Sequence, residues 1–174
     1  MNTLERLLEL TTTCSPDELR EGLRTDYENL SRDELLVAFF NAIFNRPVSV
    51  VQVFIDYGVS PNETMTSHKH SALFQAVTAC RIDMIRYFID LGADVNARDD
   101  AGMSVLHWAT DVVCDSKVQA GEEDYEVIKV LLKCGANADT VDIHGSSPLL
   151  FASSVYRVQP VVDILQASLS KQAD

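Results

Sequence analysis

The feature that most constrains this chain is an apolar block that returns four times, each time shortly before a turn. Within each block the apolar residues are spaced to lie on one face of a helix. Gly58, Gly92 and Gly135 follow the first three blocks at a fixed offset, and Ser168 stands at that offset after the fourth. A repeated helical unit predicts a solenoid, whose units pack on one another and form an extended binding surface. The four blocks are Val50-Val51 with Phe54-Ile55, Met84-Ile85 with Phe88-Ile89, Val127-Ile128 with Leu131-Leu132, and Val161 with Ile164-Leu165.

The spacing of the leading apolar residues gives the length of the repeat. Phe39 and Leu73 lie 34 residues apart, and Leu73 and Leu106 lie 33 apart. Leu106 and Leu149 lie 43 apart, because the third unit carries a ten-residue insertion around Cys114 to Asp124. An insertion of this kind is either tolerated without function or a functional loop, and the sequence leaves both interpretations open.

Short motifs in the turns and at the helix starts resemble the ankyrin repeat family. Leu91–Ala97 (LGADVNA) and Cys134–Asp139 (CGANAD) resemble the ankyrin turn, and Ser104–Ala109 (SVLHWA) resembles its Thr-Pro-Leu-His-x-Ala opening. Ser71–Ala76 and Ser147–Ala152 are looser matches. A period near 33 with two helices per unit agrees with this family. The resemblance covers about the last four fifths of the chain and implies an all-α fold, an ankyrin-repeat solenoid.

The predicted organisation is one continuous array. Ser31 and Glu34 form a capping box that begins the first inner helix early, so we expect this helix to be longer than its successors. We expect the hydroxyls of Ser71, Ser104 and Ser147 to cap the inner helices of the other repeats. The array consists of an N-terminal helical cap at 1–30, followed by repeats at about 31–66, 67–99, 100–142 and 143–174.

The charge of the chain limits its partners. The formal net charge is −12 at pH 7, the sequence pI is about 4.6, and the 14 Lys and Arg residues are scattered along the sequence. We therefore expect no nucleic-acid partner, because phosphate contacts need clustered basic residues. A basic protein surface is the better electrostatic match, although the charge could equally serve solubility alone.

The cysteines and the N-terminal residues indicate a cytoplasmic protein, and we expect it to be a monomer when free. None of the four cysteines forms a Cys-x-x-Cys pair, and Cys80 and Cys134 fall on helical segments where buried free thiols are common. Residues 1–6 lack the basic region and apolar core of a signal peptide. No apolar run approaches the roughly 20 residues that span a bilayer, so we expect no membrane association.

Residues with catalytic or metal-binding chemistry are few. His68 and His70 flank Lys69, a spacing that suits two zinc ligands, but no Cys or carboxylate pair accompanies them at a metal-site spacing. A solvated turn is the competing interpretation. The sequence has no nucleophile elbow, phosphate-binding glycine loop or His-Glu-x-x-His signature. We therefore expect a protein that is not an enzyme and takes neither metal nor cofactor.

The resemblance also assigns a role to His107. It matches the motif histidine of the family, which is implied to be a structural hydrogen-bonding residue. Phe40, Phe74 and Leu150 occupy the equivalent positions of the other repeats. We therefore expect apolar packing to replace the polar network that links the repeats of regular arrays.

The functional signal is a row of unlike residues on the inner helices. Asn41, Gln75, Trp108 and Phe151 each lie two residues after the leading apolar residue. The resemblance implies that inner helices and hairpin fingers line a concave groove. Trp and Tyr are enriched at binding hot spots in general, which favours Trp108 as a contact residue. Trp108 could instead pack between inner helices. The candidate partner-binding residues are Gln75, Arg98, Asp100, Met103, Trp108, Asp111, Val112, Ile143, His144 and Phe151.

The function that these features favour is a non-catalytic protein–protein interaction module. Its concave groove and fingers would bind one folded protein partner. A dedicated inhibitor that neutralises a basic enzyme or toxin is the alternative, because an acidic surface steers a basic partner toward it. An enzyme is the remote alternative.

Overall fold

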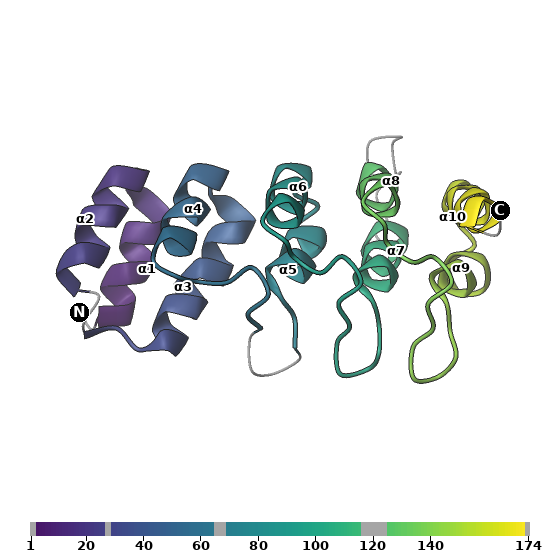
Figure 1. The fold of residues 1–174 in the computed structure, drawn as a ribbon, viewed down its shortest axis with the longest axis horizontal. Helices are drawn as coiled ribbons and strands as arrows, with labels where there is room; N and C mark the ends of the chain where they lie inside the picture. Colours follow the sequence, from purple (N-terminus) through teal and green to yellow (C-terminus); the bar gives the residue numbers. More distant parts are fainter. Residues whose placement is uncertain (1–2, 27–28, 65–68, 116–124, 173–174) are drawn as a thin grey trace.

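The computed structural model describes residues 3–26, 29–64, 69–115 and 125–172, and there the chain folds into consecutive helix pairs. Figure 1 shows the pairs side by side in one row, with odd-numbered helices in an inner layer and even-numbered helices in an outer layer. The all-α solenoid predicted from the sequence is thus confirmed. The helices are α1 (Thr3–Thr13), α2 (Pro16–Asp26), α3 (Arg32–Asn45), α4 (Val48–Asp56), α5 (Ala72–Thr78), α6 (Ile82–Asp90), α7 (Val105–Asp115), α8 (Glu126–Lys133), α9 (Pro148–Leu150) continuing as the π-helix η2 (Phe151–Tyr156), and α10 (Gln159–Gln172).

The core is shared between neighbouring pairs. Phe39 of α3 meets Phe54 of α4 and Phe88 of α6, with ring centroids 6.0 Å apart in each case and the rings edge to face. Leu73 and Leu106 are also fully buried. Because Phe39 contacts two repeats at once, its burial stabilises the stacking of repeats as well as its own helix pair.

Local sequence signals explain where most helices begin and end. Ser31 and Glu34 form a complete capping box, and α3 is 14 residues long against 7 for α5 and 11 for α7. Gly58, Gly92 and Gly135 take φ angles of +86°, +85° and +94° after the outer helices, a region that glycine adopts without strain. The predicted long first inner helix is therefore confirmed.

The predicted caps hold for two of the three serines. The Ser147 hydroxyl accepts the N–H of Leu150, and the Ser104 hydroxyl lies 2.8 Å from Nδ1 of His107 and accepts the His107 N–H. The prediction is wrong for Ser71, whose side chain makes no capping bond. The residue equivalent to His107 is Phe74 in this repeat, which offers no ring nitrogen to orient the serine hydroxyl.

Polar bonds between repeats run along the turns that follow the outer helices. The side-chain amide of Asn62 donates to the carbonyl of Gly92 (3.1 Å) and its carbonyl accepts the N–H of Asp94 (3.0 Å). Asn96 makes the same two bonds one repeat further on, to the Gly135 carbonyl (3.2 Å) and to the N–H two residues later (2.8 Å). We call these contacts the asparagine ladder.

The expectation that apolar packing replaces the polar network is therefore wrong. Phe40 and Phe74 are buried as expected, but polar contacts persist in the asparagine ladder and at Arg81. The Arg81 guanidinium donates to the carbonyls of Ile43 and Arg46 in the preceding repeat. The polar links lie in the turns because backbone groups there have no partner within a helix.

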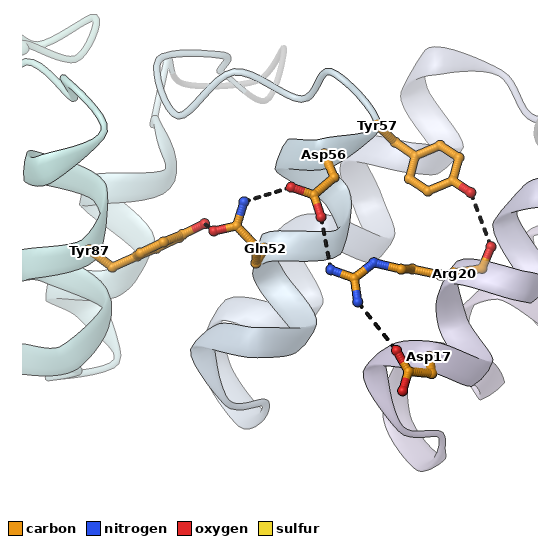
Figure 2. Close-up of polar contacts among 6 residues, drawn as sticks. All are labelled: Asp17, Arg20, Gln52, Asp56, Tyr57 and Tyr87. Carbon is orange, nitrogen blue, oxygen red and sulfur yellow. Dashed lines mark hydrogen bonds and ion pairs between the residues drawn. The ribbon is translucent and has the colours of Figure 1, made fainter.

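A second set of polar contacts connects three outer helices (Figure 2). Arg20 of α2 donates to Asp56 of α4 (2.9 Å), Gln52 donates to the same carboxylate (2.7 Å), and the Tyr87 hydroxyl of α6 donates to Gln52. The hydrogen bond from Arg20, followed by that from Gln52, holds the pKa of Asp56 below its usual value. Burial, and then the Asp56 charge, raises the pKa of Tyr87 to about 12. Tyr87 therefore stays a neutral donor.

The cysteines differ from the expectation. None of the four forms a disulfide, but Cys80 and Cys134 are exposed rather than buried. Cys134 is the C-cap of α8, and Cys80 follows the C-cap of α5 with a φ of +52°, so neither lies on a core-facing helix surface. The insertion at 116–124 and His68 lie outside the described residues, and the predicted repeat boundaries stay predictions.

Leu106→Ala should lower the free energy of unfolding by ~2–5 kcal/mol, because it leaves a cavity between adjacent repeats. Urea denaturation followed by circular dichroism measures this change. An unchanged midpoint would contradict the shared core.

Asn96→Ala should destabilise by ~1 kcal/mol, since it removes two bonds between repeats. Asp139→Ala is the matched control, because Asp139 stands at the same offset from Gly135 as Asn96 from Gly92. Equal unfolding midpoints for the two variants would mean that the asparagine ladder contributes nothing.

Candidate functional site

The loops from α4 to α5, from α6 to α7 and from α8 to α9 project, in their described residues, to one side of the array (Figure 1). We call them the first, second and third fingers. In the second finger the Asp99 carboxylate accepts the N–H groups of Ala101 and Met103, both at 2.9 Å. In the third finger Asp142 accepts those of His144 and Ser146, both at 2.8 Å. Each of these two fingers therefore contains the same kind of turn, closed by hydrogen bonds to an aspartate side chain.

Burial raises the pKa of Asp142, but the N–H groups of Ser146 and His144 outweigh this effect and keep the pKa below its usual value. The carboxylate therefore stays ionised near neutral pH and continues to accept both bonds.

A cavity of about 310 Å³ opens between the first and second fingers. Trp108 forms its wall, and the indole N–H donates to the second carboxylate oxygen of Asp99 (3.0 Å). His70 packs edge to face on Trp108 with ring centroids 4.8 Å apart, and stacks on Phe74 at 5.0 Å. The Trp108 ring is thereby fixed in place while one side remains accessible. The cavity is lined by His70, Asp99, Asp100, Ala101 and Trp108.

Two carboxylates at this cavity have different surroundings. The Asp99 side chain is only 8% exposed and lies 3.7 Å from Nε2 of His70. Asp100 is 54% exposed and pairs with Lys69 at 2.9 Å. An exposed ion pair of this kind contributes little to stability.

The predicted inner-helix row is partly accessible. Gln75, Trp108 and Phe151 are half-buried, and Asn41 is exposed. Phe151 packs edge to face on His107 with centroids 5.9 Å apart. Trp108 thus packs against His70 and Phe74 and also faces the cavity, so the two interpretations of this residue are compatible.

Several predicted finger residues are engaged within the array. Arg98 donates to the carbonyls of Val141 (2.7 Å) and Gly102 (3.2 Å), and to the Thr140 hydroxyl. The Arg98 guanidinium thereby ties the second finger to the third. The Asp111 carboxylate accepts the hydroxyl of Tyr156, which connects α7 to η2.

The remaining predicted residues vary in exposure. Ile143 is 68% exposed at the tip of the third finger, and His144 beside it is exposed. Met103 and Val112 are half-buried. Ile143 and His144 are thus accessible to a partner, but they lie on a different finger from the cavity.

His107 connects two repeats as a neutral ring. Its Nε2–H donates to the carbonyl of Ser146 (2.9 Å), while Nδ1 accepts the N–H of Ser104 (3.1 Å). Burial lowers the pKa of His107 below 6.5 and outweighs the opposing effect of the Ser146 bond. A proton on Nδ1 would face the Ser104 N–H, so the charged form fits this site poorly.

Sequence reasoning missed the role of Asp99, and it considered His70 as a zinc ligand or as part of a solvated turn but not as a ring that packs on Trp108. Asp99 and Asp142 stand at the same offset from Gly92 and Gly135, which is the signal that could have identified the turn-closing carboxylate. Across the described ranges, no group of three or more His, Cys, Asp or Glu side chains could hold a metal ion. No helix in the described part of the chain is long and apolar enough to cross a membrane.

Comparison with known proteins places the repeats in a family. The family model described as "Ankyrin repeats (many copies)" matches residues 73–110. The mouse B-cell lymphoma 3 protein homolog is 26% identical over 171 residues, which cover 98% of this chain and 33% of that protein. The ankyrin repeat protein FPV230 of fowlpox virus is 26% identical over 137 residues, which cover 66% of this chain and 73% of that protein.

The intracellular phospholipase A2 of Caenorhabditis elegans is also 26% identical to this chain, over 171 residues. It covers 94% of this chain and 14% of that protein. The chain therefore spans much less than two thirds of the worm and mouse proteins.

The free energy of unfolding should fall as the pH drops below 6.5 and should level off once the pH passes the lowered pKa of His107. The unfolded state binds the proton first, which is why acid destabilises the fold in this window. His107→Leu should remove this pH step, because Leu150 shows that leucine is accepted at the equivalent position. His144→Gln, at an exposed histidine, should keep the step. Urea denaturation at a series of pH values measures it, and equal slopes for wild type and His107→Leu would contradict the assignment.

Proposed function

Because the chain belongs to the ankyrin repeat family, we propose that it is a non-catalytic module that binds a folded protein through its fingers and inner helices. Ankyrin repeats are protein–protein interaction modules, and stacked repeats offer an extended rigid surface. The asparagine ladder and Arg98 support this proposal, since they fix the fingers relative to one another.

The observation that carries the proposal is the cavity beside Trp108. An indole held by Asp99 and His70 keeps its position without a partner, so binding costs little side-chain entropy. Trp108 is also the single tryptophan of the chain, and tryptophan is enriched at interface hot spots.

The same cavity selects for charge. An aromatic ring next to the Asp99 and Asp100 carboxylates suits an Arg or Lys side chain, which can lie on the ring and pair with Asp100. A net charge of −12 adds long-range steering of a basic surface toward the molecule. We therefore propose a basic protein as the partner.

An adaptor and an inhibitor of a basic enzyme or toxin would both use this surface. The inhibitor is favoured by the acidic charge, because electrostatic steering raises association rates. A strong loss of affinity with salt would support the inhibitor, and a salt-insensitive affinity would support an adaptor that depends on Trp108. The similarity to the worm phospholipase gives no reason to propose catalysis here, because it spans 14% of that protein.

The proposal includes a reducing compartment and a monomeric free state. Four cysteines outside disulfides, two of them exposed, suit the cytoplasm, where thiols stay reduced.

Trp108→Ala should weaken partner binding by at least ~2 kcal/mol, with a smaller effect on folding than Leu106→Ala. Partners are captured from a native extract on immobilised wild type, Trp108→Ala and Arg86→Ala, and identified by mass spectrometry. Arg86 is the control because it is exposed on the outer helix α6.

A protein retained by wild type and Arg86→Ala but lost by Trp108→Ala supports the proposal once its dissociation constant confirms the difference. Retention of every partner by folded Trp108→Ala would exclude the cavity as the binding site. A large drop in the thermal midpoint with unchanged affinity would assign Trp108 to packing alone.

A further inference from the structure

A groove of about 470 Å³ lies between the outer helices α8 and α10, away from the fingers. Its α10 side is a stripe that recurs every three or four residues, so one face of that helix lines the groove along its length. The groove has an apolar floor between basic walls. It is lined by Lys129, Leu132 and Lys133 of α8 and by Ile164, Ala167 and Lys171 of α10.

Within the described residues, no side-chain hydrogen bond or ion pair joins α8 to α10. Tyr87, Gln52, Asp56 and Arg20 span the upstream outer helices (Figure 2). The π-helix η2 and the left-handed Arg157 precede α10, and they set where this helix can pack.

The charge of the groove is opposite to that of the whole chain. Three of the five lysines converge here, two from α8 and one from the distant α10, while the net charge of the chain is −12. Lys133 stands two residues before Gly135, the place that Asp56 and Asp90 occupy before Gly58 and Gly92. The third repeat thus carries a reversed charge at this position.

Few carboxylates of the fold lie close enough to neutralise the positive charge of these lysines. Lys129 lies 3.9 Å from Glu126, and both side chains are about half exposed. Among the described residues, neither Lys133 nor Lys171 has a carboxylate within ion-pair distance, and both are exposed. Their ammonium groups are therefore available to a ligand.

We propose that this groove binds an acidic amphipathic helix of a partner protein. The apolar face of that helix packs on Leu132 and Ile164, and its carboxylates pair with the flanking lysines, as in helix-in-groove recognition. The apolar floor favours a peptide over an inorganic anion. An anionic bilayer is disfavoured, because the site is hollowed and the net charge of −12 repels such a surface.

This site is independent of the proposed finger surface. The groove lies on the outer helices and selects an acidic partner, whereas the cavity at Trp108 lies between the fingers and suits a basic one. A chain with both sites can hold two partners of opposite charge at once.

The test measures the fluorescence anisotropy of a labelled helical peptide of about 16 residues with Glu on one face and Leu on the other. Wild type is compared with Lys133→Gln/Lys171→Gln. The control Arg24→Gln/Arg86→Gln removes the same charge at two exposed residues outside both proposed sites. We expect the groove variant to bind at least about fivefold more weakly and the control to bind within about twofold of wild type. A peptide with Gln in place of Glu should also bind weakly.

Ala167→Leu probes the groove without changing charge. Ala167 is exposed, so the variant should keep its circular dichroism spectrum and thermal midpoint while the added side chain occupies the groove and weakens binding. Equal binding by wild type and the groove variants, or equal losses in the control, would overturn the proposal. Anionic vesicles serve as the competing ligand. The proposal would be overturned in favour of a membrane surface if wild type binds the vesicles, the groove variant does not, and the acidic peptide fails to bind wild type.

Discussion

The rest of the structure depends on the burial of each inner helix against its neighbours. A helix pair of this size cannot cover its own apolar face, so its stability comes from side chains that two repeats share. Phe39 shows this most directly, because it contacts phenylalanines on its own outer helix and on the next one. Once the stacking distance is fixed, backbone groups of successive turns come within reach of one asparagine side chain, and the fingers take defined positions.

This stacking explains why polar contacts lie at the edges of the array and apolar contacts lie between its layers. Asn62 and Asn96 form hydrogen bonds with backbone groups of the next turn, and His107 forms one with a backbone carbonyl of the next finger. A groove lies on the outer surface of the array where such links are absent among the described residues. The groove between α8 and α10 is the clearest case, because small side chains and lysines stand where a bridging network stands upstream.

Much of the fold, but less of the candidate site, could be predicted from the sequence. The glycine offsets predicted the left-handed turns, and Ser31 with Glu34 predicted the start of α3, because both effects act within a few residues. The asparagine ladder and the Asp99–Trp108 bond were missed, since they depend on distances between turns and helices that only the stacked array defines. The lysine groove was missed for the same reason: Lys129 and Lys171 are distant in sequence.

The central claim is that the face formed by the fingers and inner helices is rigid and binds a protein partner around Trp108. Hydrogen–deuterium exchange of the chain alone and in complex with the captured partner tests it most directly. The account predicts that the amides of 98–108 become protected on binding, while those of α2 and α4 keep their exchange rates. Protection centred on those outer helices, with 98–108 unchanged, would contradict it.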